Sequence, residues 1–191
     1  MNINELIIDI KNNLNETFMS VDLWFDKDQT MRSYKPLSGG WTIDQILEHI
    51  GLTNRFLLIL IHKGANKALQ NLQNLDLKHE LSNYTFHRDK LIEVGLHKSF
   101  PWIRPEHMEP KGEKTLPEVR QQLKDQLNLC LSILNELKNG EGVLYKTTMT
   151  VNDLGKIDVY EYIYFLAQHG QRHITQMKKN ENEFNSNQSN S

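Results

Sequence analysis

Two histidines near the end of the chain have the residue type and spacing of metal ligands. His169 and His173 lie in a segment whose apolar residues recur with the period of an amphipathic helix. On a helix they are about 40° apart around the axis and about 6 Å apart along it, so both rings can reach one ion. Leu166, His169, His173 and Met177 follow steps of three, four and four residues, which places both imidazoles on the apolar face. The chain has eight histidines, so a pair four residues apart can arise by chance. The position of both rings on the apolar face is therefore stronger evidence for a metal site than their spacing.

A third histidine, His49, lies at or beside the apolar face of another predicted helix. It follows Ile46 by three residues and precedes Thr53 by four. Three neutral imidazoles with open positions are typical of a catalytic zinc-type site, whereas structural zinc sites use four protein ligands, mostly thiolates. A chain with one cysteine does not fit a structural zinc site. The alternative is that His169 and His173 only hydrogen-bond to buried carbonyls or to each other, and spacing does not choose between these hypotheses.

The sequence offers no obvious general base beside these histidines. Gly170 follows His169, so the glutamate of the H-E-x-x-H motif of zinc proteases is missing. Glu48 and Asp153 are poor candidates, and Glu48, which precedes His49, is predicted to point away from it into solvent. Hydrolysis benefits from a positioned carboxylate or histidine, whereas metal–thiolate chemistry needs less from its neighbours. Thiol transfer is therefore favoured over hydrolysis, with a non-catalytic metal-binding or small-molecule-binding module and a helical interaction protein as alternatives.

Four amphipathic segments are expected to position the histidines. Apolar residues at helical spacing predict helices over 4–23, 42–64, 115–140 and 158–179, and a less distinct one over 84–94. Capping boxes are predicted where Thr42, Thr115 and Asp158 precede Gln or Glu by three residues, and Gly64 is predicted to end the second helix. No pattern is strong enough to predict a sheet. We therefore predict an all-α fold of one domain, residues 1–179, built as a four-helix bundle with long crossover connections, and a disordered polar tail, residues 180–191.

Composition and charge exclude several classes of protein. With 22 Lys and Arg against 24 Asp and Glu, the chain lacks the basic excess of a general nucleic-acid-binding protein. The longest aliphatic run, 56–61, is too short to span a membrane, and the first residues lack the pattern of a secretory signal. The single cysteine, Cys130, falls on an apolar stripe, which favours a buried residue over a nucleophile and fits a reducing compartment. The expectation is a cytoplasmic protein with a small-molecule substrate.

Three stretches of the chain together form a recognisable pattern. They are Gly40 to Ile50 (GWTIDQILEHI), Met108 to Gly112 (MEPKG), and Asp158 to Gln176, which contains DVYEY and HGQRHITQ. Here the chain resembles the DinB/YfiT-like superfamily of metal-dependent proteins, which includes the bacillithiol S-transferases. The resemblance extends in order over nearly the whole chain except the polar tail.

This resemblance has implications for the site and its chemistry. It implies a divalent metal ion, such as nickel or zinc, held by His49, His169 and His173, and a homodimer. The expected activity is transfer of a low-molecular-weight thiol, of the bacillithiol type, to a small electrophile, with hydrolysis of a small molecule as the alternative. The sequence contains no recognisable thiol-binding signature, so the resemblance does not identify the substrate of this chain.

The long connection between the second and third predicted helices is expected to line the mouth of the site. A substrate reaches a metal position inside a bundle only through a gap between its elements. Prolines stiffen the segment 100–110, in which Trp102 and Met108 supply apolar surface for substrate binding. The alternative is that Trp102 and Met108 only cover the end of the bundle.

Overall fold

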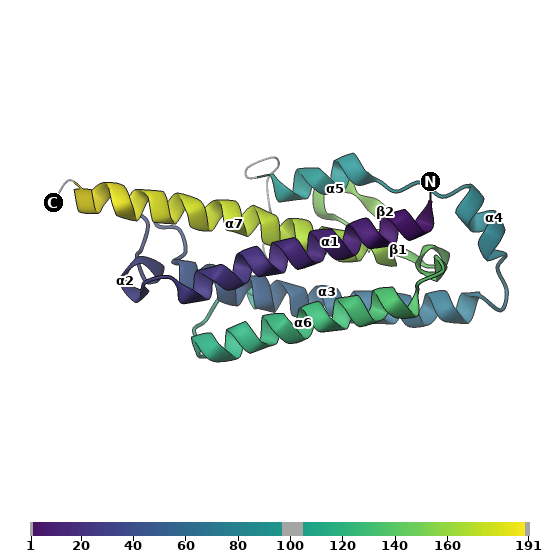
Figure 1. The fold of residues 1–191 in the computed structure, drawn as a ribbon, viewed down its shortest axis with the longest axis horizontal. Helices are drawn as coiled ribbons and strands as arrows, with labels where there is room; N and C mark the ends of the chain where they lie inside the picture. Colours follow the sequence, from purple (N-terminus) through teal and green to yellow (C-terminus); the bar gives the residue numbers. More distant parts are fainter. Residues whose placement is uncertain (1, 97–104, 190–191) are drawn as a thin grey trace.

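Four long helices form where the sequence has apolar residues at helical spacing, and they pack together as a bundle (Figure 1). The computed structural model describes residues 2–96 and 105–189. The four helices are α1 (Ile3–Asp22), α3 (Ile43–Asn71), α6 (Leu116–Glu136) and α7 (Val159–Ser189). Their inward faces share one hydrophobic core, in which Ile10, Ile46 and Leu134 are completely buried. The predicted all-α fold is therefore confirmed.

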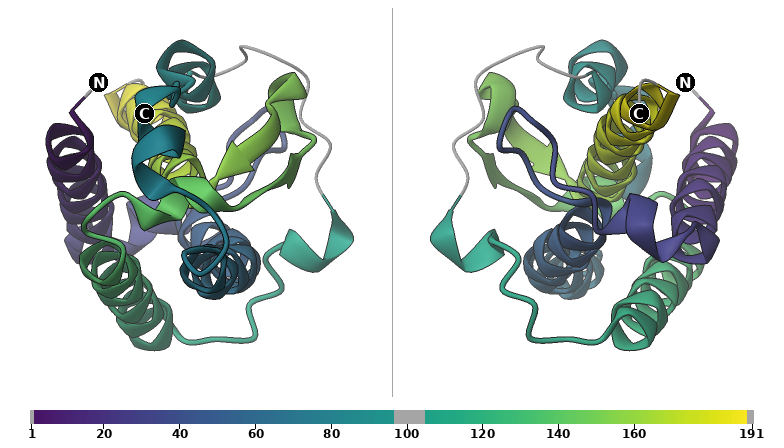
Figure 2. Two further views of the ribbon diagram at one scale, coloured as in Figure 1. Left: turned by 90° about the vertical axis from the view of Figure 1, so that its right-hand side faces the viewer. Right: turned by 90° about the vertical axis from the view of Figure 1, so that its left-hand side faces the viewer.

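The direction of the helices explains the long crossover. α1 and α3 each pack against both α6 and α7, and Figure 2 shows this square arrangement end-on. In Figure 1, α1 and α7 run in one direction while α3 and α6 run in the other. The chain between the parallel helices α3 and α6 must therefore return along the bundle. On this return it forms α4 (Leu77–Ser82), α5 (Arg88–Gly95), which packs against α7, and a 3-10 helix (Glu106–Met108).

The other two connections also carry short elements. Between α1 and α3 lie a 3-10 helix (Leu23–Asp26) and α2 (Gln29–Arg32). Between α6 and α7 lie 3-10 helices (Glu141–Leu144 and Val151–Asp153) and the antiparallel strands β1 (Lys146–Met149) and β2 (Gly155–Asp158). The sequence did not predict this hairpin because strands of four residues are too short to establish an alternating pattern. The signal lies in its turn, where Asn152, Asp153 and Gly155 adopt positive φ angles.

The predicted helix starts are present, and their caps have the expected geometry. Thr42 Oγ1 accepts a hydrogen bond from the Gln45 backbone N–H (3.2 Å), and Gln45 Oε1 accepts one from the Thr42 N–H (3.0 Å). Asp158 and Glu161 form the same reciprocal pair, at 3.0 Å each, at the start of α7. Thr115 occupies the cap position of α6. Capping residues therefore predicted correctly where three of the four long helices begin.

The second helix does not stop at Gly64, as the sequence had predicted, but continues to Asn71. Gly64 is buried, and a Cβ added there would lie 3.1 Å from Val159 Cγ2. The buried residues Ala65 and Ala68 continue the apolar stripe beyond it. The glycine thus allows α3 to pack closely against the start of α7.

The last helix also extends further than predicted. The tail was expected to be disordered from residue 180, but the structure continues α7 to Ser189. Asn180 is buried, and its Nδ2 donates to the Trp41 carbonyl (2.8 Å). The Glu183 carboxylate accepts from the Tyr34 hydroxyl (2.8 Å) and the Leu37 backbone N–H (2.7 Å). Polar contacts to the segment before α3 thus hold a helix end whose composition suggested disorder.

Two further observations bear on function. Cys130 is completely buried in α6, and burial raises the pKa of its thiol to about 12, so it is no nucleophile at neutral pH. Among the residues that the structure describes, no helix combines the length and apolar character needed to cross a membrane.

Candidate metal centre

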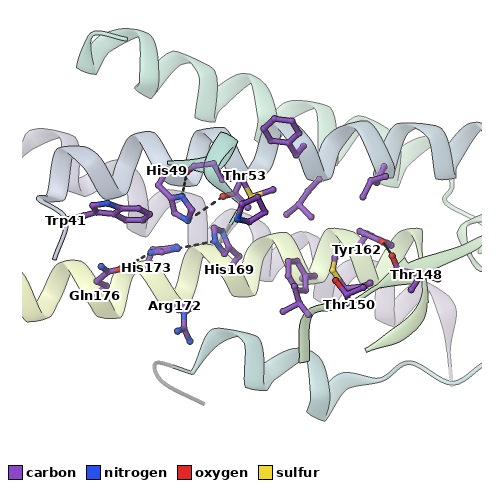
Figure 3. Close-up of a pocket in the computed structure, with 18 of the residues that line it drawn as sticks. Trp41, His49, Thr53, Thr148, Thr150, Tyr162, His169, Arg172, His173 and Gln176 are labelled. Atoms are coloured by element: carbon purple, nitrogen blue, oxygen red, sulfur yellow. Dashed lines mark hydrogen bonds between the residues drawn. The ribbon is translucent and has the colours of Figure 1, made fainter. Parts of the chain in front are cut away.

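Three histidines from two antiparallel helices meet inside the bundle (Figure 3). His49 comes from α3, and His169 and His173 lie one turn apart on α7. The three residues are only 5%, 2% and 6% exposed, respectively. One ring nitrogen from each lies within 4.8 Å of the others. The structure therefore brings together the three residues that the sequence had singled out.

The spacing of the rings suits a shared ion. His169 Nε2 and His173 Nε2 are 3.1 Å apart. The centroid of the His49 ring lies 5.3 Å from that of His169 and 4.8 Å from that of His173. With zinc–nitrogen distances of about 2.0–2.1 Å, two nitrogens of a tetrahedral site are about 3.3 Å apart. The separation of His169 Nε2 and His173 Nε2 is close to this value, and a nitrogen of His49 lies within 4.8 Å of a nitrogen in each of these two rings.

The orientation of His49 is fixed by a backbone carbonyl. Its Nδ1 lies 2.7 Å from the carbonyl oxygen of Met108. A carbonyl can only accept, so Nδ1 carries the proton, and in the neutral ring Nε2 keeps its lone pair. Metal-binding histidines typically make this kind of outer hydrogen bond, which sets the tautomer and the ring plane.

His173 is oriented in the same way by a side chain on its own helix. Its Nδ1 donates to Gln176 Oε1 at 2.9 Å, which leaves Nε2 facing His169. The pKa of His169 lies well below its ordinary value because the ring is buried and because His173, His49 and Arg172 would each oppose a further positive charge. Neutral imidazoles with inward lone pairs are the form that binds divalent ions, so the donor set fits a metal such as zinc or nickel.

Glu48 has a different role from the predicted solvated charge. Its side chain is buried, at 8% exposure. The carboxylate accepts hydrogen bonds from the backbone N–H of Gly112 (2.9 Å) and of Lys111 (3.3 Å). These residues follow Met108, whose carbonyl holds His49. Glu48 and His49 therefore secure the same segment, a relation that helical spacing could not reveal because the segment belongs to the crossover.

A cavity of about 810 Å³ opens onto the histidines and continues between α3 and α7. Its size lies in the range typical of small-molecule sites. The lining residues are Gly39, Gly40, Trp41, His49, Thr53, Phe56, Leu57, Leu60, Pro105, Met108, Thr148, Met149, Thr150, Val151, Tyr162, Phe165, His169, Arg172, His173 and Gln176. Met108 lines this cavity, and its role in substrate binding stays a prediction. Trp102 lies outside the described residues.

The cavity wall holds no carboxylate among the described residues. Arg172 carries the one permanent charge of that lining, and its Nη1 donates to the Leu96 carbonyl at 2.5 Å. Asp153, considered as a base from the sequence, is an exposed residue of the hairpin turn and does not line the cavity. The site therefore supplies nitrogen ligands, and its described lining offers no acidic general base.

Some residues of the site could not be found from the sequence alone. Trp41 lies with its ring centroid 4.6 Å from that of His49, and Thr53 Oγ1 is 3.5 Å from His49 Nε2. Gln176, which orients His173, could have been suspected from the sequence, because side chains three residues apart on a helix lie close enough to interact. The hairpin residues Thr148 and Thr150 had none, because the hairpin itself was not predicted.

Comparison with models of protein families identifies a family for this chain. The model of the DinB superfamily matches residues 28–177, a range that contains all three histidines. Neither curated proteins nor solved structures gave a significant match.

Proposed function

The chain belongs to the DinB superfamily, and we propose that His49, His169 and His173 hold one divalent metal ion, nickel or zinc, that activates a low-molecular-weight thiol. The observation that carries this proposal is the pair of outer hydrogen bonds, from His49 to Met108 and from His173 to Gln176. Both leave the Nε2 lone pair directed toward the cluster, which a merely structural histidine would not require.

The reaction that fits the site best is transfer of the thiol to a small electrophile. A divalent ion bound by three imidazoles lowers the pKa of a thiol or water at its open position, so that a nucleophile exists at neutral pH. The sulfur then forms a bond to the electrophilic carbon, the bond from that carbon to its leaving group breaks, and the thiol proton passes to solvent. The protein orients the reactants in the cavity, where the Trp41 ring packs beside the His49 ring and the Met108 carbonyl holds His49 Nδ1.

Thiol transfer is preferred to hydrolysis because of the residues that line the cavity. Attack by water usually requires a positioned base, and the described lining contains no carboxylate. The carboxylate nearest in sequence, that of Glu48, is engaged by the backbone of Lys111 and Gly112. A thiol that is already ionised needs no such base.

Metal binding is the first test of this proposal. The metal content of the purified protein is measured, and the affinity of the metal-free protein for zinc and nickel is determined by competition with a chromophoric chelator. His169→Ala is expected to lose stoichiometric binding. His79→Ala is the control, because that histidine lies with 70% of its side chain exposed on α4. Wild-type protein that binds neither metal would overturn the proposal.

Activity is the second test. The metal-loaded protein is incubated with a panel of low-molecular-weight thiols and a fluorogenic halide, and formation of the thioether is followed. We expect the wild-type protein to form the thioether faster than the uncatalysed reaction does. His169→Ala should lose this rate enhancement, and His79→Ala should keep it. A protein that binds metal tightly but transfers none of the thiols would instead be a binding module.

A further inference from the structure

The cavity extends beyond the histidines along α3. On α3, Thr53, Leu57 and Leu60 follow His49 at helical spacing, so the same face that carries the histidine continues as a cavity wall. Thr53 and Leu60 are about 10 Å apart along the axis. The cavity therefore extends well past the metal ligands along this helix.

The facing helix, α7, lines the same part of the cavity from the other side. On α7, Phe165 and Tyr162 precede His169 at helical spacing and also line the cavity. Because α3 and α7 run in opposite directions, Leu57 and Leu60 lie toward the same end as Phe165 and Tyr162. We call the part of the cavity lined by Phe56, Leu57, Leu60, Met149, Val151, Tyr162 and Phe165 the apolar arm.

The hairpin closes the apolar arm on one side. Tyr162 Oη donates to the Thr148 carbonyl at 3.0 Å, so β1 is attached directly to α7 (Figure 3). This bond uses the tyrosine hydroxyl and leaves the ring at the cavity wall. The hairpin also brings Thr148 and Thr150 to the cavity wall beside Met149 and Val151, so the wall at this end is mostly aliphatic and aromatic, with these two threonines among its polar residues.

The charges around the histidines favour a ligand whose polar end is an anion. The imidazoles are metal ligands in the proposed function, and the described lining contributes no acidic side chain. The guanidinium of Arg172 points away from the histidines and donates to the Leu96 carbonyl (Figure 3), so the charge that matters here is that of the ion. A dication at three neutral ligands leaves an uncompensated positive charge in a largely buried site. Because Coulomb interactions are stronger there than in water, an anionic ligand is favoured over a neutral or cationic one.

We propose that the ligand of this cavity is an amphipathic anion, with a thiolate or carboxylate head at the histidines and an apolar chain along the apolar arm. The position of the head rests on the proposed function, whereas the position of the chain depends only on the lining residues. The substrate class is thus a thiol or acid with an extended aliphatic or aryl-alkyl group, rather than a compact, uniformly hydrophilic one.

A chain-length series tests the proposal. Straight-chain carboxylates from acetate to decanoate are titrated into the zinc-loaded protein by calorimetry. The affinity is expected to rise about fourfold with each methylene until the arm is filled. Alkylamines of equal length are expected to bind at least about tenfold more weakly, because their charge is reversed. Affinity that does not depend on chain length, or amines that bind as tightly as carboxylates, would overturn the inference.

Matched variants locate the chain in the apolar arm. Leu60→Gln should reduce the gain per methylene for the longer carboxylates and leave the affinity for acetate and zinc unchanged. Ile59→Gln is the control, because Ile59 is adjacent on α3, 58% exposed, and outside the lining. Leu60 itself is 39% exposed, so a polar side chain there is expected to keep contact with solvent in the folded state. If Leu60→Gln does not fold, Val151→Asn makes the same test from the hairpin.

The metal-free protein separates the two proposals. Without zinc, carboxylates should bind more weakly but with the same gain per methylene, since the arm does not need the ion. A protein that binds no zinc and still shows this gain would refute the metal proposal and support the arm. A protein that binds zinc and shows no gain in either form would refute the arm alone.

Discussion

The buried carboxylate of Glu48 allows a sharp test of how the metal centre is held. Glu48→Gln keeps the length of the side chain but removes the charge and replaces one acceptor oxygen by a donor amide. In the wild type the carboxylate accepts from two backbone N–H groups, at 2.9 Å from Gly112 and 3.3 Å from Lys111. Hydrogen bonds to charged groups contribute about 1.5–3 kcal/mol each. Oε1 accepts from both N–H groups, since it also lies 3.1 Å from the Gly112 nitrogen, so glutamine can keep one acceptor for both and loses the charge and the second oxygen. We therefore expect the free energy of unfolding to fall by about 1–2 kcal/mol.

The effect should extend to the metal. The segment that Glu48 anchors includes Met108, whose carbonyl orients His49, so loosening the segment also loosens a ligand. Loss of such an outer hydrogen bond typically lowers metal affinity 10- to 100-fold, and we expect about tenfold because the Met108 carbonyl remains in the chain. Urea unfolding of the metal-free protein measures the first effect, and chelator competition with zinc measures the second.

Glu113→Gln serves as the control for charge, because Glu113 is exposed in the same connection. It should change neither quantity. If Glu48→Gln lowers stability but binds zinc as tightly as the wild type, the proposed link from Glu48 through the segment to His49 is refuted.

Three other perturbations have defined outcomes. Thr42→Ala removes the capping bond to the Gln45 N–H and should lower the free energy of unfolding by about 1 kcal/mol in urea titrations. Burial and the charge of Glu161 raise the pKa of Asp158, so the folded state binds more protons than the unfolded chain, and stability should fall as pH rises above about 4 toward the raised pKa. Asp158→Asn keeps a capping side chain and should flatten that dependence in urea titrations at several pH values. Deletion of residues 180–191 removes the contacts of the tail with residues 34–41, and hydrogen exchange should become faster there while the histidines still bind zinc.

Local patterns were enough to predict the bundle and the histidine cluster. The apolar period placed His49, His169 and His173 on inward faces, and the capping residues Thr42 and Asp158 marked where two of the helices begin. These signals lie within a few residues of each other in sequence, so they need no knowledge of the tertiary fold. The resemblance added the ligand set and the long crossover.

What the sequence did not predict depends on contacts between distant segments. Gly64 resembled a helix end, but its lack of a Cβ serves the packing of Val159. Glu48 resembled a surface charge until the crossover covered it. The polar composition after residue 179 suggested disorder because the partners of that tail lie some 140 residues earlier, as in the 139-residue separation of Asn180 from Trp41.

Helix α7 imposes a constraint on length rather than on residue identity. It is one continuous helix of 31 residues, about 46 Å long, that carries two of the clustered histidines and, beyond them, the contacts to the segment before α3. Inserting or deleting one residue between His173 and Asn180 would leave the histidines in place but rotate the tail by about 100°. Asn180 would then face away from the Trp41 carbonyl. Residues 174–179 should therefore accept many substitutions at their exposed positions, whereas a change in their number would break the contact of Asn180 with the Trp41 carbonyl.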